Sequence, residues 1–442
     1  MLEPGMRPIV ASEVHDTIGR HLLKAGLPIV LDLRRSQGAL VRDSLSGDDF
    51  LDFLGFYGSN ALGFNHPKLT DSVTRDRLID AALIKVGNPE FYTPEYAEFV
   101  RTFERTAAPP THPHYFFIDG GALGVENAMK AAMDWKVRKN LAAGRGEIGT
   151  EILHFENAFH GRAGYTLSVT NTDPNKTLYF PKFDWPRIPA PVAHFPLRDE
   201  NLKLTEAAEA ASIADIERAF EQRPHRIAAI LIETIQGEGG DGHFRSEFLA
   251  ALRRIADERE ALLIFDEVQC GGGVTGSWWA HDHAGLRPDL ICFAKKLQVG
   301  GFIASTRIDD VDNVFKVPSR ISSTWGGALV DMVRATRVLE IIEEDRLLDN
   351  TRERGFELMT ELEALQAEFP RRVSNVRGRG LFCALDLPST EERNSFIKRC
   401  FEARLLVLAG GQRTVRFRPA LTLGTEHVKL AAERLRGVLS ST

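Results

Sequence analysis

Three features that could do chemistry on an amine stand at the ends of apolar runs. Lys295 ends the run 290–295, Asp266 falls near the end of the run 261–268, and Gly120-Gly121 stand between an apolar run and a helical pattern. Lysine is rarely buried, so an amine at the end of a buried strand is expected to have a lowered pKa suited to Schiff-base chemistry. A carboxylate and a glycine-rich helix start can hold a pyridinium nitrogen and a phosphate. Together these residues predict a site for pyridoxal phosphate.

Each of these features also has a plain structural interpretation. Lys295-Lys296 could begin a solvated loop, and Gly120-Gly121 could be an ordinary turn between a strand and a helix. A rival motif, Gly237-x-Gly239-x-x-Gly242, follows the run 227–233 in the order of a dinucleotide fingerprint. Two points weaken it. Three residues separate the run from the first glycine, and Glu238 would face a pyrophosphate with like charge.

The apolar runs alternate with helical patterns through the middle of the chain. Short runs at 152–159, 227–233, 261–268, 290–295 and 302–306 read as strands buried on both faces, and 247–260 reads as an amphipathic helix. This alternation predicts a three-layer α/β/α domain with a mostly parallel sheet, which brings the strand ends together at one edge. After it we expect a long helix over 328–350, a second over 351–368, and a smaller α+β module. The expected division is an N-terminal segment 1–59 that joins the small domain, a large cofactor domain 60–327, and a linking helix with the small domain 328–442.

Composition excludes several classes of function. The 442 residues carry a net charge of −6, so no general basic footprint for nucleic acid is present. No run of 18 apolar residues predicts a membrane span, and residues 1–16 lack the apolar core of a secretory signal. The four cysteines form no CxxC pair and are expected to be reduced thiols of a cytoplasmic protein.

The sequence resembles the class III (ω-) aminotransferases, which have pyridoxal-phosphate fold type I. The matching segments follow the family order over most of the chain. The lysine 6-aminotransferase branch is the most similar in amino-acid sequence over residues 159–171, 180–188, 294–301 and 317–327. The segments are DGGALGVENAMK (119–130), NAFHGR (157–162), IETIQGEGG (232–240), LLIFDEVQCG (262–271), PDLICFAKKLQVGG (288–301), STWGG (323–327) and VRFRPAL (415–421).

The resemblance implies a complete set of cofactor contacts. Lys295 would bind pyridoxal phosphate covalently and shuttle protons, with Lys296 as the second candidate, and Asp266 would keep the ring nitrogen protonated. The remaining implied contacts are Val268 and Phe159 on the two ring faces, Gln269 at the ring hydroxyl, the backbone of Gly121 and Ala122 at the phosphate, and Thr324, which would reach the phosphate from a second subunit. An active homodimer with shared sites is therefore implied.

The resemblance also implies how two different substrates share the site. Arg162 would bind the α-carboxylate of L-lysine, and Arg416 would bind that of L-glutamate or 2-oxoglutarate. Glu238 would pair with Arg416 when lysine is bound and release it for the dicarboxylate. The implied reaction moves the ε-amino group of lysine to 2-oxoglutarate, giving 2-aminoadipate 6-semialdehyde and glutamate.

Other functions stay open at this point. Two positions, Thr234 and Ala328, depart from the residues expected in this family, and Ala328 leaves the exact amine open. The donor could be ornithine, 4-aminobutyrate, diaminobutyrate or β-lysine. An aminomutase or racemase of the same fold, a dinucleotide-binding oxidoreductase and a binding protein without activity are the further alternatives.

Overall fold

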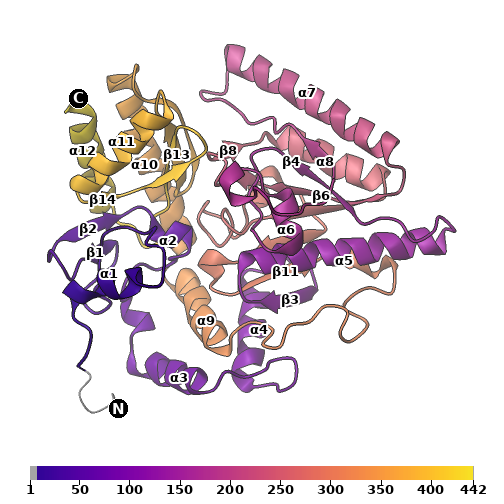
Figure 1. The fold of residues 1–442 in the computed structure, drawn as a ribbon, viewed down its shortest axis with the longest axis horizontal. Helices are drawn as coiled ribbons and strands as arrows, with labels where there is room; N and C mark the ends of the chain where they lie inside the picture. The colour runs from indigo at the N-terminus through magenta and orange to yellow at the C-terminus, as the bar shows by residue number, and fades with distance from the viewer. Residues whose placement is uncertain (1–6, 442) are drawn as a thin grey trace.

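A seven-stranded sheet forms the centre of the computed structural model, which describes residues 7–441 (Figure 1). Residues 1–6 of the expected N-terminal segment lie outside the described residues. The strand order is β3 (His114–Ile118), β11 (Gly300–Ala304), β10 (Leu290–Phe293), β9 (Leu262–Asp266), β6 (Ile227–Glu233), β4 (Glu151–Phe155) and β5 (Arg187–Ile188). Neighbouring strands from β10 to β5 are parallel. The predicted mostly parallel sheet is confirmed.

Helices cover both faces of this sheet. Along β9, Leu262 and Ile264 pack in the cluster that contains α5 (Gly121–Ala142), whereas Leu263 and Phe265 pack with α7 (Asp199–Gln222) and α8 (Ser246–Glu258). Helices α4 (Pro94–Thr106) and α9 (Leu329–Glu344) contribute to a further cluster, against β3, β10 and β11. Successive side chains of a strand point to opposite faces, so a strand buried on both faces must be apolar throughout. The three-layer prediction is confirmed.

The strand β11 runs against the direction of its neighbours. It pairs antiparallel with β10 and with β3. The run 302–306 was expected to be one more parallel strand, and that detail is wrong. Only six residues separate β10 from β11, too few for the helical crossover that a parallel pair requires.

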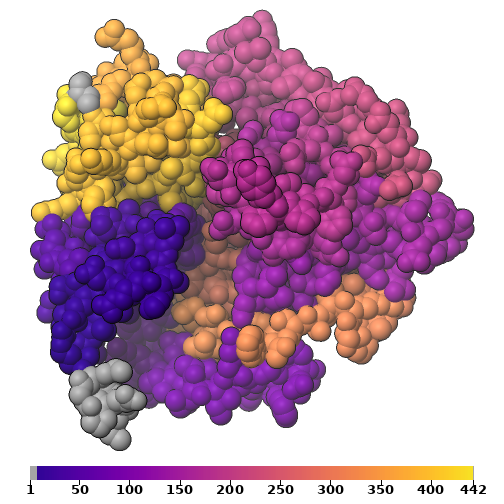
Figure 2. All heavy atoms as spheres, in the orientation of Figure 1, coloured from indigo at the N-terminus to yellow at the C-terminus, as the bar shows by residue number. Residues whose placement is uncertain are grey.

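The two ends of the chain build the second half of the molecule. A four-stranded antiparallel sheet has the order β12 (Ser374–Arg379), β13 (Phe382–Asp386), β16 (Thr414–Phe417), β15 (Leu408–Gly410). Nearby, β2 (Asp49–Asp52) pairs with β1 (Leu40–Arg42) and, in parallel, with β14 (Leu405–Leu406). Figure 2 shows the N-terminal (indigo) and C-terminal (yellow) residues side by side on the surface.

The helices after residue 328 divide at a different place from the one expected. Helix α9 ends at Glu344 and α10 runs from Leu347 to Glu368, because Arg346 adopts a left-handed conformation with φ of 50°. The expected single helix 328–350 is therefore wrong. The other helices are α1 (Ala11–Gly19), α2 (Gly55–Gly58), α3 (Ser72–Leu83), α6 (Gly164–Val169), α11 (Thr390–Glu402) and α12 (Thr425–Ser440). None of the helices within residues 7–441 has the length and apolar character needed to span a membrane.

The rival glycine motif does not form a dinucleotide turn. Its glycines lie in and beside the loop between the short antiparallel strands β7 (Ile235–Gln236) and β8 (Gly242–His243). A dinucleotide fingerprint requires its glycines directly between a strand and a helix start, and the next helix, α8, begins only at Ser246. The hairpin removes the structural basis for that alternative.

Candidate active site

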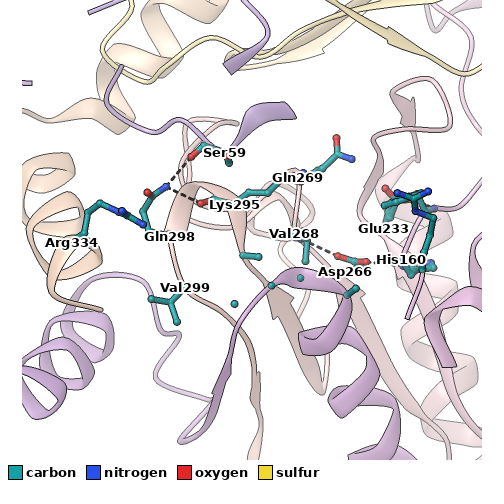
Figure 3. Close-up of a pocket in the computed structure, with 18 residues that line it drawn as sticks. Ser59, His160, Glu233, Asp266, Val268, Gln269, Lys295, Gln298, Val299 and Arg334 are labelled. Atoms are coloured by element: carbon teal, nitrogen blue, oxygen red, sulfur yellow. Dashed lines mark hydrogen bonds and ion pairs between the residues drawn. The ribbon is translucent and has the colours of Figure 1, made fainter. Parts of the chain in front are cut away.

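The carboxyl ends of β6, β9 and β10 bring the reactive side chains to one cavity. Glu233 and Asp266 are direct neighbours in the pairing of β6 with β9, and Lys295 follows β10 by two residues. The cavity has a volume of about 570 Å³, and its lining includes Lys295, Asp266, Phe159 and Arg162. In Figure 3, Asp266, His160 and Glu233 lie on one side, Gln298 and Arg334 lie on the other, and Lys295 and Val268 lie between them.

Lys295 is the lysine that lines the cavity. It opens a 3-10 turn with φ of 48°, and its carbonyl accepts hydrogen bonds from the backbone N and the Nε2 of Gln298. Burial, reinforced by the positive charge of Arg416 and opposed by Asp266, lowers the pKa of Lys295 to about 8. A fraction of the amine is therefore neutral, and nucleophilic, near neutral pH.

Lys296 points away from this cavity. Its Nζ donates hydrogen bonds to the backbone carbonyls of Asn60, at 2.9 Å, and Pro419, at 3.2 Å. These carbonyls come from the N-terminal and C-terminal parts of the chain. Lys296 thus joins the two parts beside the cavity, and of the two adjacent lysines only Lys295 lines it.

A buried pair of acidic and imidazole groups lies at the end of β9. Asp266 Oδ2 is 2.7 Å from His160 Nδ1, and Oδ1 accepts a hydrogen bond from the backbone N of Val268. Beside the pair, Glu233 accepts hydrogen bonds from the backbone N of Phe159 and Gly237. Burial raises the pKa of Glu233 to about 7, with Asp266 adding to the shift and His160 opposing it. The backbone contacts fix these carboxyl groups in orientation.

The start of α5 provides a place for an anion. The helix has 22 residues, and Gly120, Gly121 and Ala122 at its N-terminus line the cavity. The first N–H groups of a helix lack intrahelical acceptors and carry partial positive charge. A Cβ on Gly121 would lie 2.7 Å from Cγ1 of Val268. Only glycine at position 121 therefore leaves the backbone accessible beside the side chain of Val268, which follows β9.

Three predicted residues lie outside the lining of this cavity. Arg416 is buried just behind it, where its NH1 donates to Oε1 of Gln269 at 3.3 Å and its Nε donates to the carbonyl of Ala409. Glu238 pairs with Lys176 and not with Arg416 in this structure. Thr324 belongs to a segment that packs on residues 87–89.

The remaining predicted residues lie in the lining of one cavity. The lining contains Gly121, Ala122, Phe159, Arg162, Asp266, Val268, Gln269 and Lys295. An amine, a carboxylate and a helix N-terminus thus meet in one cavity.

The family model described as aminotransferase class-III matches residues 23–439. The chain belongs to the class-III aminotransferases. The L-lysine-epsilon aminotransferase of Mycobacterium tuberculosis is 49% identical over 436 residues, which cover 98% of this chain and 96% of the relative. That of Streptomyces clavuligerus is 45% identical and covers 96% and 93%. The solved lysine aminotransferase from M. tuberculosis in the internal aldimine form superposes with a TM-score of 0.96 at 49% identity, over 98% of this chain and 99% of the other.

Enzymes of this family depend on pyridoxal phosphate, and the residues of this class-III aminotransferase fit that cofactor. Lys295 offers the amine, Asp266 the carboxylate, and the open backbone at Gly121 the room for a phosphate. The predictions of an aminotransferase and of its cofactor are confirmed. Within residues 7–441 no cluster of histidine, cysteine and acidic side chains could hold a metal ion.

Several residues that line the cavity of this class-III aminotransferase were not predicted from sequence. His160 and Glu233 stand inside the family-like segments NAFHGR and IETIQGEGG, but no role was expected for either. Ser59 and Gln298 are joined by a hydrogen bond from Gln298 Nε2 to the Ser59 carbonyl, and Arg334 comes from α9. A buried carboxylate such as Asp266 needs a partner, but its partner His160 is 106 residues away and no local pattern identifies it. No local pattern signals Ser59, Gln298 or Arg334.

Proposed function

We propose that this class-III aminotransferase transfers the ε-amino group of L-lysine to 2-oxoglutarate, giving 2-aminoadipate 6-semialdehyde and L-glutamate. The observation that carries the proposal is a strand-end amine, Lys295, in one cavity with Arg162 and with Arg416 directly behind Gln269. Two guanidinium groups suit substrates that each carry an α-carboxylate. The donor is supported by the 49% identity to relatives named for lysine.

The residues around the cavity are assigned different roles in the reaction. Pyridoxal phosphate, when bound, supplies the electron sink for moving the amino group. Lys295 would hold the cofactor through its Nζ and would carry the proton that the transfer moves, a role that its lowered pKa favours. Asp266, oriented by His160 and by the backbone of Val268, would keep the pyridine nitrogen protonated.

The other cofactor contacts follow from their positions in the cavity. We assign Val268 and Phe159 to the two faces of the ring, Gln269 to the ring hydroxyl, and the N–H groups of Gly121 and Ala122 to the phosphate. All five residues line the cavity that Lys295 and Asp266 share.

Recognition of the two substrates is assigned to the charged residues farther out. Arg162 lines the cavity and forms no ion pair with any residue between 7 and 441, so it is available for the lysine α-carboxylate. Arg416 has no carboxylate within ion-pair distance among the described residues. It is thus open to the α-carboxylate of glutamate or 2-oxoglutarate. Glu238 is assigned to neutralise Arg416 while lysine is bound.

A homodimer is part of the proposal. Thr324 is assigned to the phosphate in the cavity of the partner subunit. Near Thr324, large apolar side chains are exposed: Trp325 by 41%, Phe91 by 69% and Tyr92 by 82%. Exposed apolar groups of this size mark interaction surfaces. Light scattering should give twice the chain mass, and coexpressed Lys295→Ala and Thr324→Ala chains should regain activity that neither homodimer has. A fully active monomer would contradict this arrangement.

We also propose a cytoplasmic location. All four cysteines are free and buried, which fits a reducing compartment. Fractionation of the native cells with an antibody tests this: the protein should remain with the soluble contents after osmotic release of any outer compartment.

A panel of amino donors with 2-oxoglutarate tests the reaction. L-Lysine, ornithine, 4-aminobutyrate, diaminobutyrate and β-lysine are offered at equal concentrations, and glutamate formation is measured. We expect lysine to give the highest kcat/KM. Strong ornithine turnover beside little lysine turnover would overturn the donor assignment. Loss or rearrangement of lysine without any glutamate would instead indicate an aminomutase or racemase.

A further inference from the structure

Lys176 forms an ion pair with Glu238, the carboxylate that is assigned to neutralise Arg416 while lysine is bound. Its Nζ forms an ion pair with Oε1 of Glu238, which also accepts a hydrogen bond from Oγ1 of Thr172 at 3.3 Å. The same Nζ lies 5.5 Å from the centre of the Phe159 ring, and Phe159 lines the cavity. Lys176 therefore stands at the edge of the active site, although it is not one of its lining residues.

The backbone around Glu238 is fixed, so only its side chain can change partner. Its carbonyl accepts a hydrogen bond of 2.8 Å from the backbone N of Gly411. A Cβ on the next residue, Gly239, would lie 2.0 Å from the carbonyl oxygen of Asn157. This contact means that the hairpin is closely packed on the segment before Phe159. A change of partner by Glu238 must come from rotation of its side chain.

The ion pair between Lys176 and Glu238 can exchange. The side chains of Lys176 and Glu238 remain 28% and 20% exposed, and ion pairs with this degree of solvent contact contribute little net free energy. Arg416, by contrast, is only 4% exposed and is oriented by Gln269 and Ala409. The cationic partner of Glu238 is thus partly exposed at the edge of the cavity, whereas Arg416 is buried and held in orientation.

The cations in this region influence one another. The pKa of Lys176 is lowered by burial and by the positive charges of Arg162 and Arg416, while Asp173, on the same loop, opposes the shift. Pro174 and the cap that Asp173 provides to the backbone N of Asn175 shape the turn that carries Lys176. The turn places Lys176 where Glu238 can reach it.

We propose that Lys176 is a positioning residue for substrate selection, which holds Glu238 away from Arg416 and so keeps Arg416 open for the dicarboxylate substrate. The inference deepens the proposed function, since it rests on the assignment of Arg416 to glutamate and 2-oxoglutarate. Arg162 and Arg416 are the cations that act on Lys176, and without the Lys176 amine we expect Glu238 to turn to Arg416, the arginine that the proposed function assigns to it. The free enzyme then favours the lysine-binding arrangement.

Binding of glutarate, a five-carbon dicarboxylate that cannot react, tests the inference without turnover. The full chain loaded with pyridoxal phosphate is titrated with glutarate by calorimetry as wild type, Lys176→Met, Lys176→Gln and Lys176→Arg. We expect about fivefold weaker binding for the Met and Gln variants, the range of a partly exposed ion pair, and recovery in the Arg variant. Lys203→Met, which removes an exposed lysine of α7, should bind as wild type.

Stopped-flow measurement of the two half-reactions provides the second readout. Lys176→Met should raise the KM for glutamate and for 2-oxoglutarate about fivefold and should leave the kcat with these two substrates unchanged. The KM for lysine should stay equal or fall. An equal loss in both half-reactions would overturn the inference, because it would indicate a general structural role of Lys176.

A double-mutant cycle separates action through Glu238 from direct binding. In a Glu238→Gln background, Lys176→Met should have no further effect on glutarate affinity, because the carboxylate that it holds is gone. A full fivefold loss in that background would show that Lys176 binds the dicarboxylate itself and would overturn the inference. Failure of the lysine half-reaction in the wild type, with these glutarate results intact, would count against the donor assignment instead.

Discussion

The strand-end side of the active site and the outer side opposite it hold their charges in different ways. At the strand ends, Asp266 and Glu233 are buried and bonded to backbone N–H groups, so neither can turn without losing a buried hydrogen bond. On the outer side, Glu238 and Lys176 are partly exposed and paired side chain to side chain. Asp266 and Glu233, on the side that both half-reactions are expected to use, are thus fixed. Glu238, which is assigned to distinguish the two substrates, is instead paired with a partly exposed lysine.

This difference predicts two classes of variant. Changes at the strand ends should impair the lysine and the glutamate half-reactions alike. Changes on the outer side should separate the two.

Lys295→Ala should have the largest effect. Loss of the amine that we assign to the cofactor should lower turnover with either substrate by about 10³-fold or more. The purified variant should also lack the visible absorption that the wild type gains on binding pyridoxal phosphate. Lys296→Met is the matched control and should keep both properties, and a Lys295→Ala enzyme with full lysine turnover would show that the assignment of Lys295 is wrong.

Asp266→Asn should affect both half-reactions nearly as strongly. A neutral amide cannot stabilise a proton on the ring nitrogen, so kcat should fall by about 10² to 10³-fold for lysine and for glutamate. Asp309→Asn removes the carboxylate from another close histidine pair, with His114 at 2.7 Å, and should leave kcat unchanged. A loss confined to one substrate would contradict the assignment of Asp266 to chemistry that both half-reactions share.

Arg416→Lys should separate the substrates. A lysine side chain at position 416 cannot form the paired hydrogen bonds that a guanidinium makes with a carboxylate. The KM for 2-oxoglutarate should therefore rise by about 10 to 100-fold. The lysine half-reaction should change much less. Arg393→Lys, which alters a second arginine bonded to backbone carbonyls of the same sheet region, serves as the control. Equal losses with lysine and 2-oxoglutarate would place Arg416 among the groups that serve both.

Lys296 joins the N-terminal and C-terminal parts of the chain beside the cavity, and its effect should appear in stability. Burial lowers the pKa of Lys296 to about 7 from its ordinary value near 10.5. Between these values the unfolded chain binds more protons than the folded one, so the free energy of unfolding rises with pH. From pH 7 to pH 9 the free energy of unfolding of the wild type should rise by about 2 kcal/mol relative to that of Lys296→Met.

Urea unfolding of the holoenzyme at both pH values measures this gain. Lys203→Met provides the reference for loss of an exposed lysine. A difference between Lys296→Met and wild type that is the same at pH 7 and pH 9 would show that the Lys296 amine does not lose its proton on this range.

The strand-end side was largely predictable from sequence, because its signals are local. Apolar runs that end in Asp266 and Lys295 indicate strands buried on both faces, and parallel strands place their carboxyl ends at one edge. The Gly120-Gly121 step is equally local, since it marks where a strand meets a helix. His160 was missed because its partner Asp266 is 106 residues away.

The outer side was predicted only through resemblance, and incompletely. From the resemblance, Glu238 was expected to pair with Arg416 when lysine is bound and to release it for the dicarboxylate. No role was expected for Lys176. The position of Lys176 depends on how the loop after α6 folds over the β7–β8 hairpin. A surface lysine in a turn has no sequence feature that distinguishes it from a solvated one.

The layered α/β architecture, the buried amine and carboxylate, and the glycine step at a helix start were predictable from sequence, because each follows from burial and chain geometry over a few residues. Three outcomes required the folded molecule: which of two adjacent lysines lines the cavity, the antiparallel direction of β11, and the ion pair of Glu238 with Lys176. Those outcomes depend on contacts between segments far apart in the chain, whose side chains acquire partners only when the two halves of the molecule pack together.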